Sequence, residues 1–387
     1  MGAIDMRAVG VLGDGVTATA VRSFLLASTD YFESSVAQAD IIVTSPGIPP
    51  RQWPETSTEV ISDIEFASRV LMNQNKSPQL IGITGTNGKT TVAMGLAHVM
   101  NTIAYGNVGR PLISDVDHIR TGQPVILELS SYQLATSPTL ACSIAVIMNI
   151  ESDHIAWHGT ADAYKQAKLS IITSAETVYI PRILMSDIPL DTGGNIQIIE
   201  DLPSVQLPNF LADHNALNAA VIIDVAEQLG QDRSNAMALL RQFKRPPFRC
   251  QCIEEAHGRT IINDSKATNM AATIAAVSSI GGPKLLILAG EPKSDYSEAF
   301  LIKIMAQCHT VYVAGGLSQQ RHVFPKGWHS QLVFFDTLKA ATISALNTVG
   351  TGTILFSPSA ASFDEFTNYL DRGSAFTDYV HKNSRVH

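Results

Sequence analysis

The feature that most constrains this chain is a glycine-rich loop between a predicted strand and a predicted helix. The apolar run Gln79–Thr84 (QLIGIT) has the length of a buried strand, and a helix is predicted over residues 90–100. Between them stands Thr84-Gly85-Thr86-Asn87-Gly88-Lys89-Thr90-Thr91, although Ile83 occupies the position where the strict Walker pattern has glycine. Glycines turn backbone N–H groups toward a polyphosphate, and the helix start adds partial positive charge. The loop predicts nucleotide binding, with Lys89 on the outer phosphates and the Thr90 hydroxyl on magnesium.

Length and composition indicate a globular chain with two or three domains. The 387 residues are 45% hydrophobic and 16% charged, and the net charge of -8 argues against nucleic acid as the main ligand. The four cysteines are scattered and match neither a disulfide framework nor a zinc site, so we expect reduced thiols. The beginning of the chain lacks a signal-peptide pattern, and no apolar run is long enough to span a bilayer. We therefore expect a soluble, cytoplasmic protein with no membrane insertion.

Three successive α/β segments are predicted. Residues 1–62 contain a strand, the turn Gly13-Asp14-Gly15, a helix and a second strand at residues 40–44, which predicts a compact Rossmann-like domain. Residues 63–245 form a central P-loop domain with further apolar runs at residues 125–129 and 143–150, typical of a mostly parallel sheet. Residues 244–247 (KRPP) predict a linker. In residues 246–387 strands alternate with helices again, so we expect a C-terminal Rossmann-like domain.

Polar side chains follow two strands of the central domain. Glu128 lies near the end of the run VILEL, where a carboxylate beside a phosphate loop is placed to ligate magnesium. Residues 149–154 (NIESDH) bring carboxylates and His154 to the same edge of the sheet, although a lone histidine is usually structural. Lys168 lies in a predicted helix over residues 162–173, and the residues alone indicate a surface lysine.

The chain resembles the Mur ligases over nearly its whole length. The shared blocks are GITGTNGKTT, YGNVGRP (residues 105–111), ELSSYQL, NIESDH, AYKQAKL, HNALNA (residues 214–219), INDSKATN (residues 262–269) and SPSAASFDEFTNYLDRG (residues 357–373). The P-loop and ELSS blocks are common to all Mur ligases and to the related folylpolyglutamate synthases. The NDSKATN block and the SPxxASFD block look specific to the members that add D-glutamate.

The resemblance implies an ATP-dependent, amide-forming ligase of peptidoglycan precursor synthesis. Such a ligase activates the carboxylate of UDP-N-acetylmuramoyl-L-alanine as an acyl phosphate and couples it to D-glutamate, although the sequence alone leaves the handedness of glutamate open. Its implied catalytic residues are Lys89, Glu128, His154 and Lys168. Two magnesium ions are implied at Thr90, Glu128, His154 and Lys168, the last as a carbamate, since an ammonium group would repel the metal. We expect small-molecule substrates and a monomer.

The remaining site residues are carried over position by position. ATP binding is implied for Gly85, Thr86, Asn87, Gly88, Lys89, Thr90, Thr91, Asn215, Asn218, Arg249 and Asp264. The UDP-muramoyl-alanine substrate is implied at Val16, Thr17, Ser45, Pro46, Gly47, Asn107 and Ser130. Glutamate is implied at Lys266, Thr268, Lys293, Ser362, Phe363 and Tyr369.

Two departures from the family pattern stand out. Phe248 occupies the place of a histidine beside Arg249. The first domain leaves little room for the usual second strand, whose end contacts uracil. Two alternatives therefore stay open: a folate- or cyanophycin-type glutamate ligase, and a non-catalytic regulator that binds a nucleotide or a UDP-sugar. Retention of Lys89, Glu128, His154 and Lys168 together argues against the regulator.

Overall fold

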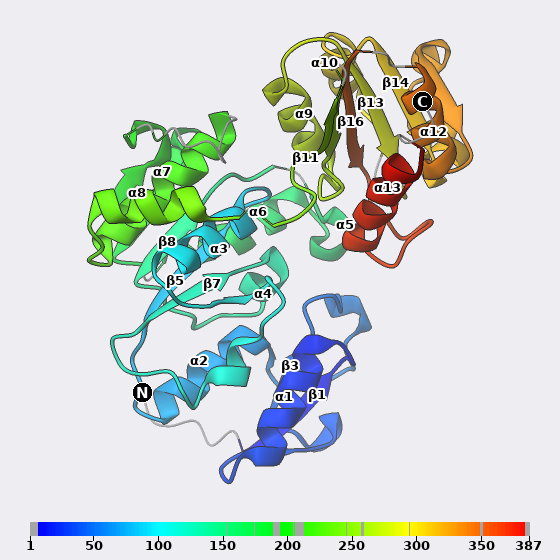
Figure 1. The fold of residues 1–387 in the computed structure, drawn as a ribbon. Helices are drawn as coiled ribbons and strands as arrows, with labels where there is room; N and C mark the ends of the chain where they lie inside the picture. The colour runs from blue at the N-terminus through cyan, green and yellow to red at the C-terminus, as the bar shows by residue number, and fades with distance from the viewer. Residues whose placement is uncertain are drawn as a thin grey trace. The chain divides into compact units, whose positions relative to one another are not determined.

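The computed structural model describes residues 7–151, 153–173, 175–188, 194–203, 205, 213–244, 246–256, 259–293, 295–348 and 351–383. Within these residues the strands form three sheets in which parallel pairing prevails (Figure 1). Contacts divide the chain into two compact units, residues 1–211 with 215–244 and residues 245–387 with 212–214. One division falls after Lys244, within the predicted linker, whose Arg245 lies outside the described residues. The three predicted domain ranges remain predictions.

The first sheet is a small parallel sheet with the strand order β2-β1-β3-β4. The sequence leaves little room for a strand between helix α1 and strand β3. The structure has a strand of only two residues there, which pairs with Ala8 and Val9 at the beginning of β1. This strand therefore ends well short of the turn at Gly13. The elements are β1 (Ala8–Leu12), α1 (Val16–Ala27), β2 (Phe32–Glu33), β3 (Ile41–Thr44) and β4 (Val60–Ser62).

The central sheet is fully parallel, with the order β10-β9-β8-β5-β7-β6. Strand β5 lies between β8 and β7, so the glycine-rich loop leaves the middle of the sheet. The helix predicted over residues 162–173 ends at Leu169 and continues as the 3-10 turn η4 (Ser170–Ile172). The elements are α2 (Asp63–Asn73), β5 (Gln79–Thr84), α3 (Lys89–Val99), β6 (Ala104–Gly106), β7 (Pro124–Glu128), α4 (Ser131–Ala135), β8 (Ile144–Ile147), α5 (Ile155–His158), α6 (Ala161–Leu169), β9 (Thr177–Ile180), β10 (Asn195–Ile198), α7 (Asp213–Gln228) and α8 (Arg233–Gln242).

Both faces of the central sheet are covered by apolar side chains. On one face, α3, α7 and α8 pack over β5 and β8 through residues such as Val92, Ile222 and Leu240 (Figure 1). On the other face the core runs without a break from Leu127 of β7 through Phe66 of α2 into the first sheet. The first sheet thus shares a hydrophobic core with the central one.

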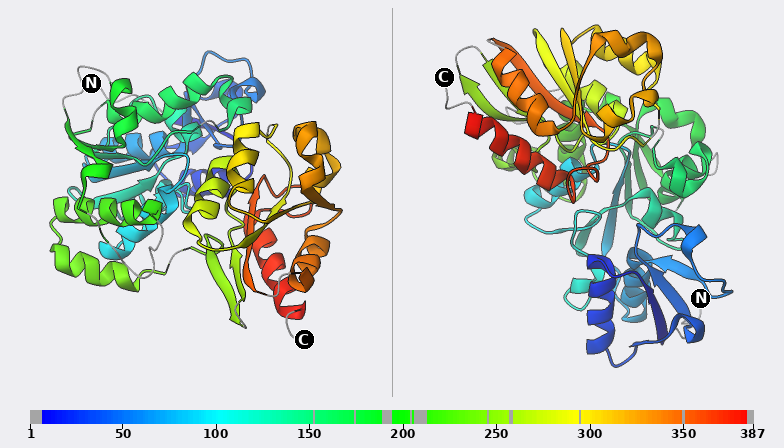
Figure 2. Two further views of the ribbon diagram at one scale, coloured as in Figure 1. Left: turned by 90° about the horizontal axis from the view of Figure 1, so that it is seen from above. Right: turned by 90° about the vertical axis from the view of Figure 1, so that its right-hand side faces the viewer.

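The third sheet has the order β11-β12-β16-β13-β14-β15, with only β11 antiparallel to its neighbour. Strand β15, an edge strand of four residues without flanking glycine or proline, was not predicted from the sequence. One face packs against α9 and α10 and the other against α12 and α13, the last drawn in red in Figure 2. The elements are β11 (Gln251–Ala256), β12 (Arg259–Asn263), α9 (Met270–Ser279), β13 (Lys284–Ala289), α10 (Glu298–Met305), β14 (Thr310–Ala314), α11 (Gly316–Gln319), β15 (Leu332–Phe335), α12 (Leu338–Thr348), β16 (Gly352–Ser359) and α13 (Tyr369–Asn383).

Across the described ranges, every helix is too short or too polar to cross a bilayer.

Candidate active site

The glycine-rich loop joins β5 to α3 in the backbone conformation that its glycines permit. Gly85 and Gly88 have φ values of 147° and 86°, which side chains other than glycine rarely adopt. Gly88 is the N-cap of α3, and a Cβ there would lie 3.0 Å from Asn218 Oδ1 of α7. The Lys89 ammonium group donates to the carbonyls of Gly85 (2.7 Å) and Thr86 (3.0 Å). Lysine and amide side chains are thus gathered at the start of α3, where a phosphate would be held.

The tip of this loop is braced by residues that the sequence analysis assigned no role. Asn149 Oδ1 accepts from the Asn87 N–H (2.8 Å), and its side-chain amide donates to the Asn87 carbonyl (3.2 Å). The Thr86 hydroxyl receives the Glu151 N–H (2.9 Å) and lies 2.8 Å from the Tyr164 hydroxyl of α6. Asn149 and Glu151 belong to the NIESDH block, whose Ser152 lies outside the described residues. The block therefore holds the shape of the loop.

Glu128 is buried at the end of β7, beside the beginning of the loop. Its side chain is 1% exposed, and β7 pairs Glu128 with Ile83 of β5. One carboxylate oxygen, Oε1, accepts from the Asn107 side-chain amide at 2.7 Å. The other, Oε2, is buried and has no hydrogen-bond partner among the described residues. A buried oxygen of this kind costs free energy unless it meets a partner, and a cation supplies one.

The surrounding donors fit magnesium better than a transition metal. The described part of the chain contains no cluster of three or more His, Cys, Asp or Glu side chains able to hold a metal by themselves. Magnesium needs only one or two carboxylates, because it keeps several waters and shares phosphate oxygens of its substrate. Glu128 beside a P-loop with a half-buried Thr90 meets that requirement.

Lys168 is a buried lysine of α6, so the prediction from the residues alone, a surface lysine, is wrong. Its side chain is 2% exposed and donates to the Gly85 carbonyl (2.8 Å) and the Thr84 hydroxyl (3.3 Å). Burial, and next the charge of Lys89, hold the pKa of the Lys168 amine well below its usual range, while Asp153 and Glu128 oppose the shift. Lys89, Glu128 and Lys168 therefore lie close enough to influence one another.

His154 begins the short helix α5 with a strained backbone. Its φ of 54° lies in the left-handed region that non-glycine residues rarely occupy, and such strain is typical of functional sites. Its Nδ1 lies 2.6 Å from the Tyr132 hydroxyl, and its Nε2 lies 3.6 Å from Asp153 Oδ2. Nearby, His158 stacks on Tyr132, and burial, followed by the charge of Lys168, lowers the pKa of His158 to about 4.

Ser130 caps the N-terminus of α4 through a reciprocal capping box. Its hydroxyl accepts from the Gln133 N–H (3.2 Å), and Gln133 Oε1 accepts from the Ser130 N–H (3.1 Å). The Gln133 side-chain amide in turn donates to Asp63 Oδ1 at 3.2 Å. Asp63 is 1% exposed, and burial raises the pKa of its carboxyl to about 6 despite the hydrogen bonds. The position of Ser130 is thus set by a buried polar chain.

Five of the seven residues predicted for the UDP-muramoyl-alanine substrate follow the carboxyl ends of β1 and β3, while Asn107 and Ser130 follow β6 and β7. Ser45 Oγ is buried without a hydrogen-bond partner in the described ranges, and a Cβ on Gly13 would lie 2.5 Å from it. Gly13 has a φ of 105°, and only glycine fits both that angle and this approach. The predicted residues of this group are Val16 and Thr17 at the start of α1, and Ser45, Pro46 and Gly47 directly after β3.

The predicted glutamate residues surround the carboxyl edge of the third sheet. The Lys266 ammonium group lies 4.3 Å from the centre of the Tyr369 ring. Ser362 is buried, whereas the neighbouring Phe363 side chain is 70% exposed. Thr268 is half-buried in the loop after β12, and Lys293 is exposed in the loop after β13. These residues come from different loops of one sheet edge.

Asp264 begins the loop after β12, and Phe248 lies beside that loop in the segment before β11. Asp264 is buried and accepts from the Ser357 hydroxyl (2.8 Å) and the Cys250 N–H (3.1 Å), and burial raises the pKa of its carboxyl to about 6. The Phe248 carbonyl accepts from the Lys266 N–H (3.1 Å), and a Cβ on Gly373 would lie 2.5 Å from the Phe248 ring. Phe248 therefore packs within the second unit, against α13.

The ATP-facing roles predicted for Arg249 and Asp264 remain predictions, because both residues belong to the second unit and the P-loop belongs to the first. Asn215 lies in α7, but its side chain lies outside the described part of the structure.

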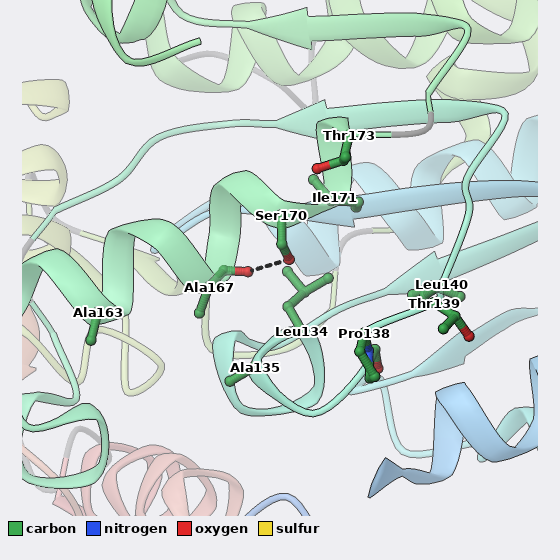
Figure 3. Close-up of a pocket in the computed structure, with 11 residues that line it drawn as sticks. Leu134, Ala135, Pro138, Thr139, Leu140, Ala163, Ala167, Ser170, Ile171 and Thr173 are labelled. Atoms are coloured by element: carbon green, nitrogen blue, oxygen red, sulfur yellow. Dashed lines mark hydrogen bonds between the residues drawn. The ribbon is translucent and has the colours of Figure 1, made fainter. Parts of the chain in front are cut away.

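A separate pocket of about 450 Å³ lies between α4 and α6. Leu134 and Ala135 of α4 face Ala163 and Ala167 of α6 across it, and the segment of residues 137–140 lines another side (Figure 3). Its lining side chains are uncharged and include none of the predicted site residues. It does, however, share its two helical walls with Ser130 and Lys168.

Comparisons with known proteins agree with this geometry. The family described as Mur ligase middle domain matches residues 83–190. A UDP-N-acetylmuramoylalanine--D-glutamate ligase from Francisella philomiragia is 27% identical over 371 residues, covering 91% of this chain and 88% of the relative. The ligase of the same name from Francisella tularensis is 27% identical over 361 residues, covering 88% and 85%.

Solved structures share the fold at lower identity. The MurF ligase from Thermotoga maritima, in complex with ADP, has a TM-score of 0.63 and 16% identity and covers 98% of this chain and 96% of its own. The folylpolyglutamate synthase from Mycobacterium tuberculosis, complexed with ADP and AMPPCP, has a TM-score of 0.62 and 15% identity, with coverages of 82% and 94%. Together with the P-loop and the buried Glu128, these matches show that the chain contains a Mur ligase middle domain and is similar, over about nine-tenths of its length, to ATP-dependent, amide-bond-forming Mur ligases.

Proposed function

We propose that this chain adds D-glutamate to UDP-N-acetylmuramoyl-L-alanine at the expense of ATP, through an acyl-phosphate intermediate. The observation that carries the proposal is the buried cluster at the P-loop, in which Glu128 presents an unpartnered oxygen near two buried or half-buried lysines, Lys89 and Lys168. The names of the Francisella relatives supply the substrates. Peptidoglycan precursor synthesis in the cytoplasm, by a monomer, follows as part of the proposal.

The physical problem for such an enzyme is to join anions. A carboxylate becomes a good electrophile only when its oxygen has been phosphorylated, and the two substrates must then be held in line. Lys89 supplies positive charge at the phosphates, and the N–H groups at the start of α3 bind them. Asn218 adjoins Gly88 and belongs to the same nucleotide pocket. Thr86 and Asn87 are held in place by Tyr164 and Asn149, and these contacts fix the shape of the loop that would receive the nucleotide.

Thr90 and Glu128 would hold one magnesium ion, and Glu128, His154 and a carbamylated Lys168 a second. When bound, magnesium neutralises the phosphate charge and polarises the transferred phosphoryl group. A buried amine beside a cation site is more stable as an anionic carbamate, because the carbamate provides oxygen ligands where an ammonium group would repel the metal. The burial of Lys168 against Gly85 supports this modification.

The remaining predicted residues divide between the two other substrates. Asn107 and Ser130 would contact the muramoyl-alanine end, and the turn at Gly13 with Ser45 would take the diphosphate and uridine. Lys266 and Lys293 would bind the two carboxylates of glutamate, with Thr268, Ser362, Phe363 and Tyr369 completing that pocket. Arg249, Asp264 and Asn215 would contact ATP.

A phosphate-release assay tests the proposal. Purified protein with ATP and magnesium should release phosphate only when UDP-N-acetylmuramoyl-L-alanine and D-glutamate are both present. Each amino acid, including L-glutamate, is offered in turn, and a folyl substrate replaces the UDP-sugar in a parallel series. Turnover with the folyl substrate alone would favour the folate-type ligase, and no turnover with any pair would favour the non-catalytic regulator.

A further inference from the structure

Arg372 of α13 is the largest fully buried side chain in the described part of the chain. Its guanidinium makes five hydrogen bonds, and all of them end on neutral oxygens. Nε donates to Ser265 Oγ (3.1 Å), and Nη2 donates to the Ser265 carbonyl (2.9 Å). Nη1 donates to the carbonyls of Ala289 (3.1 Å), Ala360 (3.1 Å) and Ala361 (3.0 Å). A buried charge that is satisfied only by backbone and hydroxyl groups is expensive, and such a charge calls for an explanation.

The acceptors of Arg372 come from three different loops at the carboxyl edge of the third sheet. Ser265 follows β12, Ala289 ends β13, and Ala360 and Ala361 follow β16. A single side chain therefore ties together three segments that are far apart in the sequence. Gly290 shows how tight this junction is, because a Cβ there would lie 2.0 Å from the Ala361 carbonyl oxygen and 2.7 Å from Arg372 Nη1.

Each of these loops carries a residue of the proposed glutamate pocket. Lys266 follows Ser265 directly, and Ser362 follows Ala361 directly. Lys293 lies two residues beyond Glu291, which pairs with Ala361 through two backbone hydrogen bonds of 2.8 and 3.0 Å.

Tyr369 is tied into the same junction from α13. Its carbonyl accepts from the Ser265 hydroxyl at 2.9 Å, and that hydroxyl also receives Arg372 Nε. Tyr369 lies one helical turn before Arg372, and its ring lies under the Lys266 ammonium group. The spacing of the proposed pocket residues therefore depends on Arg372.

The charge of Arg372 fits the same assignment. Burial lowers the pKa of the guanidinium to about 10, so the group is still a cation at neutral pH. Its hydrogen-bond partners are neutral oxygens, while the carboxylates of Asp364, Asp264 and Glu365 act on its charge through space. It is bonded to the backbone directly adjoining Lys266 and Ser362. An incoming amino acid with two carboxylates would also be attracted to the guanidinium, in an interior where Coulomb interactions are weakly screened.

We propose that Arg372 is the positioning residue of the amino-acid pocket, which holds the three loops in register and whose buried positive charge selects for a dicarboxylate amino acid. This inference rests on the proposed function, because the ligand of the pocket is glutamate only if the chain is the D-glutamate ligase. It adds a residue to which the family resemblance assigned no role.

Three variants test the proposal. Arg372→Gln removes the charge and most donors, Arg372→Lys keeps the charge with fewer donors, and Arg259→Gln is the control. Arg259 belongs to the same sheet and donates to the Leu346 carbonyl and to Glu254, at the opposite end of β12. Far-ultraviolet circular dichroism and thermal melting establish which variants are folded.

Kinetics separate positioning from charge. We expect Arg372→Gln to raise KM for D-glutamate by about tenfold or more, because a buried positive charge is lost, with a smaller change in KM for ATP. It should also lower the ratio of kcat/KM for D-glutamate to that for D-glutamine, which has one carboxylate fewer. Arg372→Lys should raise KM for both D-glutamate and D-glutamine but keep the ratio of their kcat/KM values. Arg259→Gln should match the wild type in all of these constants. If Arg372→Gln does not fold, the kinetics and hydrogen exchange of Arg372→Lys test the positioning role.

Hydrogen–deuterium exchange gives a readout without turnover. Backbone amides of residues 264–268 and 360–369 should exchange faster in Arg372→Lys than in the wild type, while those of β14 should not change. A folded Arg372→Lys with wild-type exchange and a wild-type KM for D-glutamate would overturn the positioning role. An equal loss for D-glutamate and D-glutamine in Arg372→Gln would overturn the charge role. Failure of the proposed function looks different, since the wild type itself would then show no turnover with glutamate.

Discussion

Replacing Asp63 by Asn should stabilise the protein, and the gain should grow with pH. Asp63 is fully buried in the first turn of α2, and its carboxyl has a pKa of about 6 in the folded chain, compared with an ordinary 3.8. A carboxyl whose pKa is raised on folding stabilises the fold at low pH, and this contribution is lost as pH rises from 3.8 through 6. Above that window the buried carboxylate costs about 3 kcal/mol, because each pKa unit corresponds to about 1.4 kcal/mol.

The difference in free energy of unfolding between Asp63→Asn and the wild type isolates the effect of the buried charge. Linkage gives a smaller cost at pH 5 than at pH 8, so the advantage of Asp63→Asn should rise by about 1 kcal/mol between these two pH values. The amide keeps an oxygen for the Gln133 side chain, and any loss of the other hydrogen bonds to the carboxylate adds a cost that does not vary with pH.

Urea unfolding measures the free energy of unfolding of the wild type and of Asp63→Asn, at pH 5 and at pH 8. Tryptophan fluorescence follows the transition. Trp53 and Trp157 report on the unit that contains Asp63. A matched control is Asp162→Asn, since Asp162 is an exposed residue in the first turn of α6. An advantage of Asp63→Asn that is equal at both pH values, or smaller at pH 8, would refute the reasoning.

Four further predictions concern the proposed chemistry. Glu128→Gln should lower kcat by about a hundredfold or more in a folded protein, with the exposed Glu176→Gln as control, and near-normal turnover would contradict the two-metal assignment. Lys168→Ala should be nearly inactive and partly restored by short carboxylic acids. Mass spectrometry under bicarbonate should find the carbamate on the wild type. An unmodified, magnesium-loaded enzyme with full activity would rule out the carbamate. Lys266→Ala should raise KM for glutamate strongly and KM for ATP little, whereas the reverse result would assign the pocket to ATP. In calorimetry, UDP alone should bind weakly or undetectably, while UDP-N-acetylmuramoyl-L-alanine should bind measurably. The reason is that two missing hydrogen bonds to uridine weaken binding by about five- to a hundredfold. Tight binding of UDP would show that other residues of the first sheet contact uridine.

Local pattern was enough to predict the P-loop and the parallel sheets. The strand QLIGIT, the glycines and the helix start are adjacent in sequence, and the backbone angles of Gly85 and Gly88 are those the pattern requires. The alternation of strands and helices likewise predicted the three sheets. Such features depend on interactions between near neighbours, and those are visible in a single sequence.

The features that depend on burial were harder to predict. Lys168 looks like one of several polar residues on a helix, and only the packing of α6 against the P-loop shows that its amine is buried on the Gly85 carbonyl. The brace formed by Asn149 and Tyr164, the two-residue strand β2 and the edge strand β15 were likewise missed. Arg372 lies within a block that carried the family resemblance, yet its five acceptors come from loops on three strands. Contacts between distant segments leave little trace in local composition.

The shared core of the first two sheets limits how this chain can be shortened or divided. Phe66 of α2 belongs to the same apolar cluster as Val9 and Ile41 of the first sheet and Leu127 of the central sheet. Removing residues 1–62 would expose that face of α2 to water, and an apolar patch of this kind promotes aggregation. A separately expressed central domain should therefore be insoluble, whereas residues 246–387, with their own two cores, offer a better starting point for an isolated fragment. A shortened form of the protein for ligand screening should accordingly keep the first two sheets in one polypeptide.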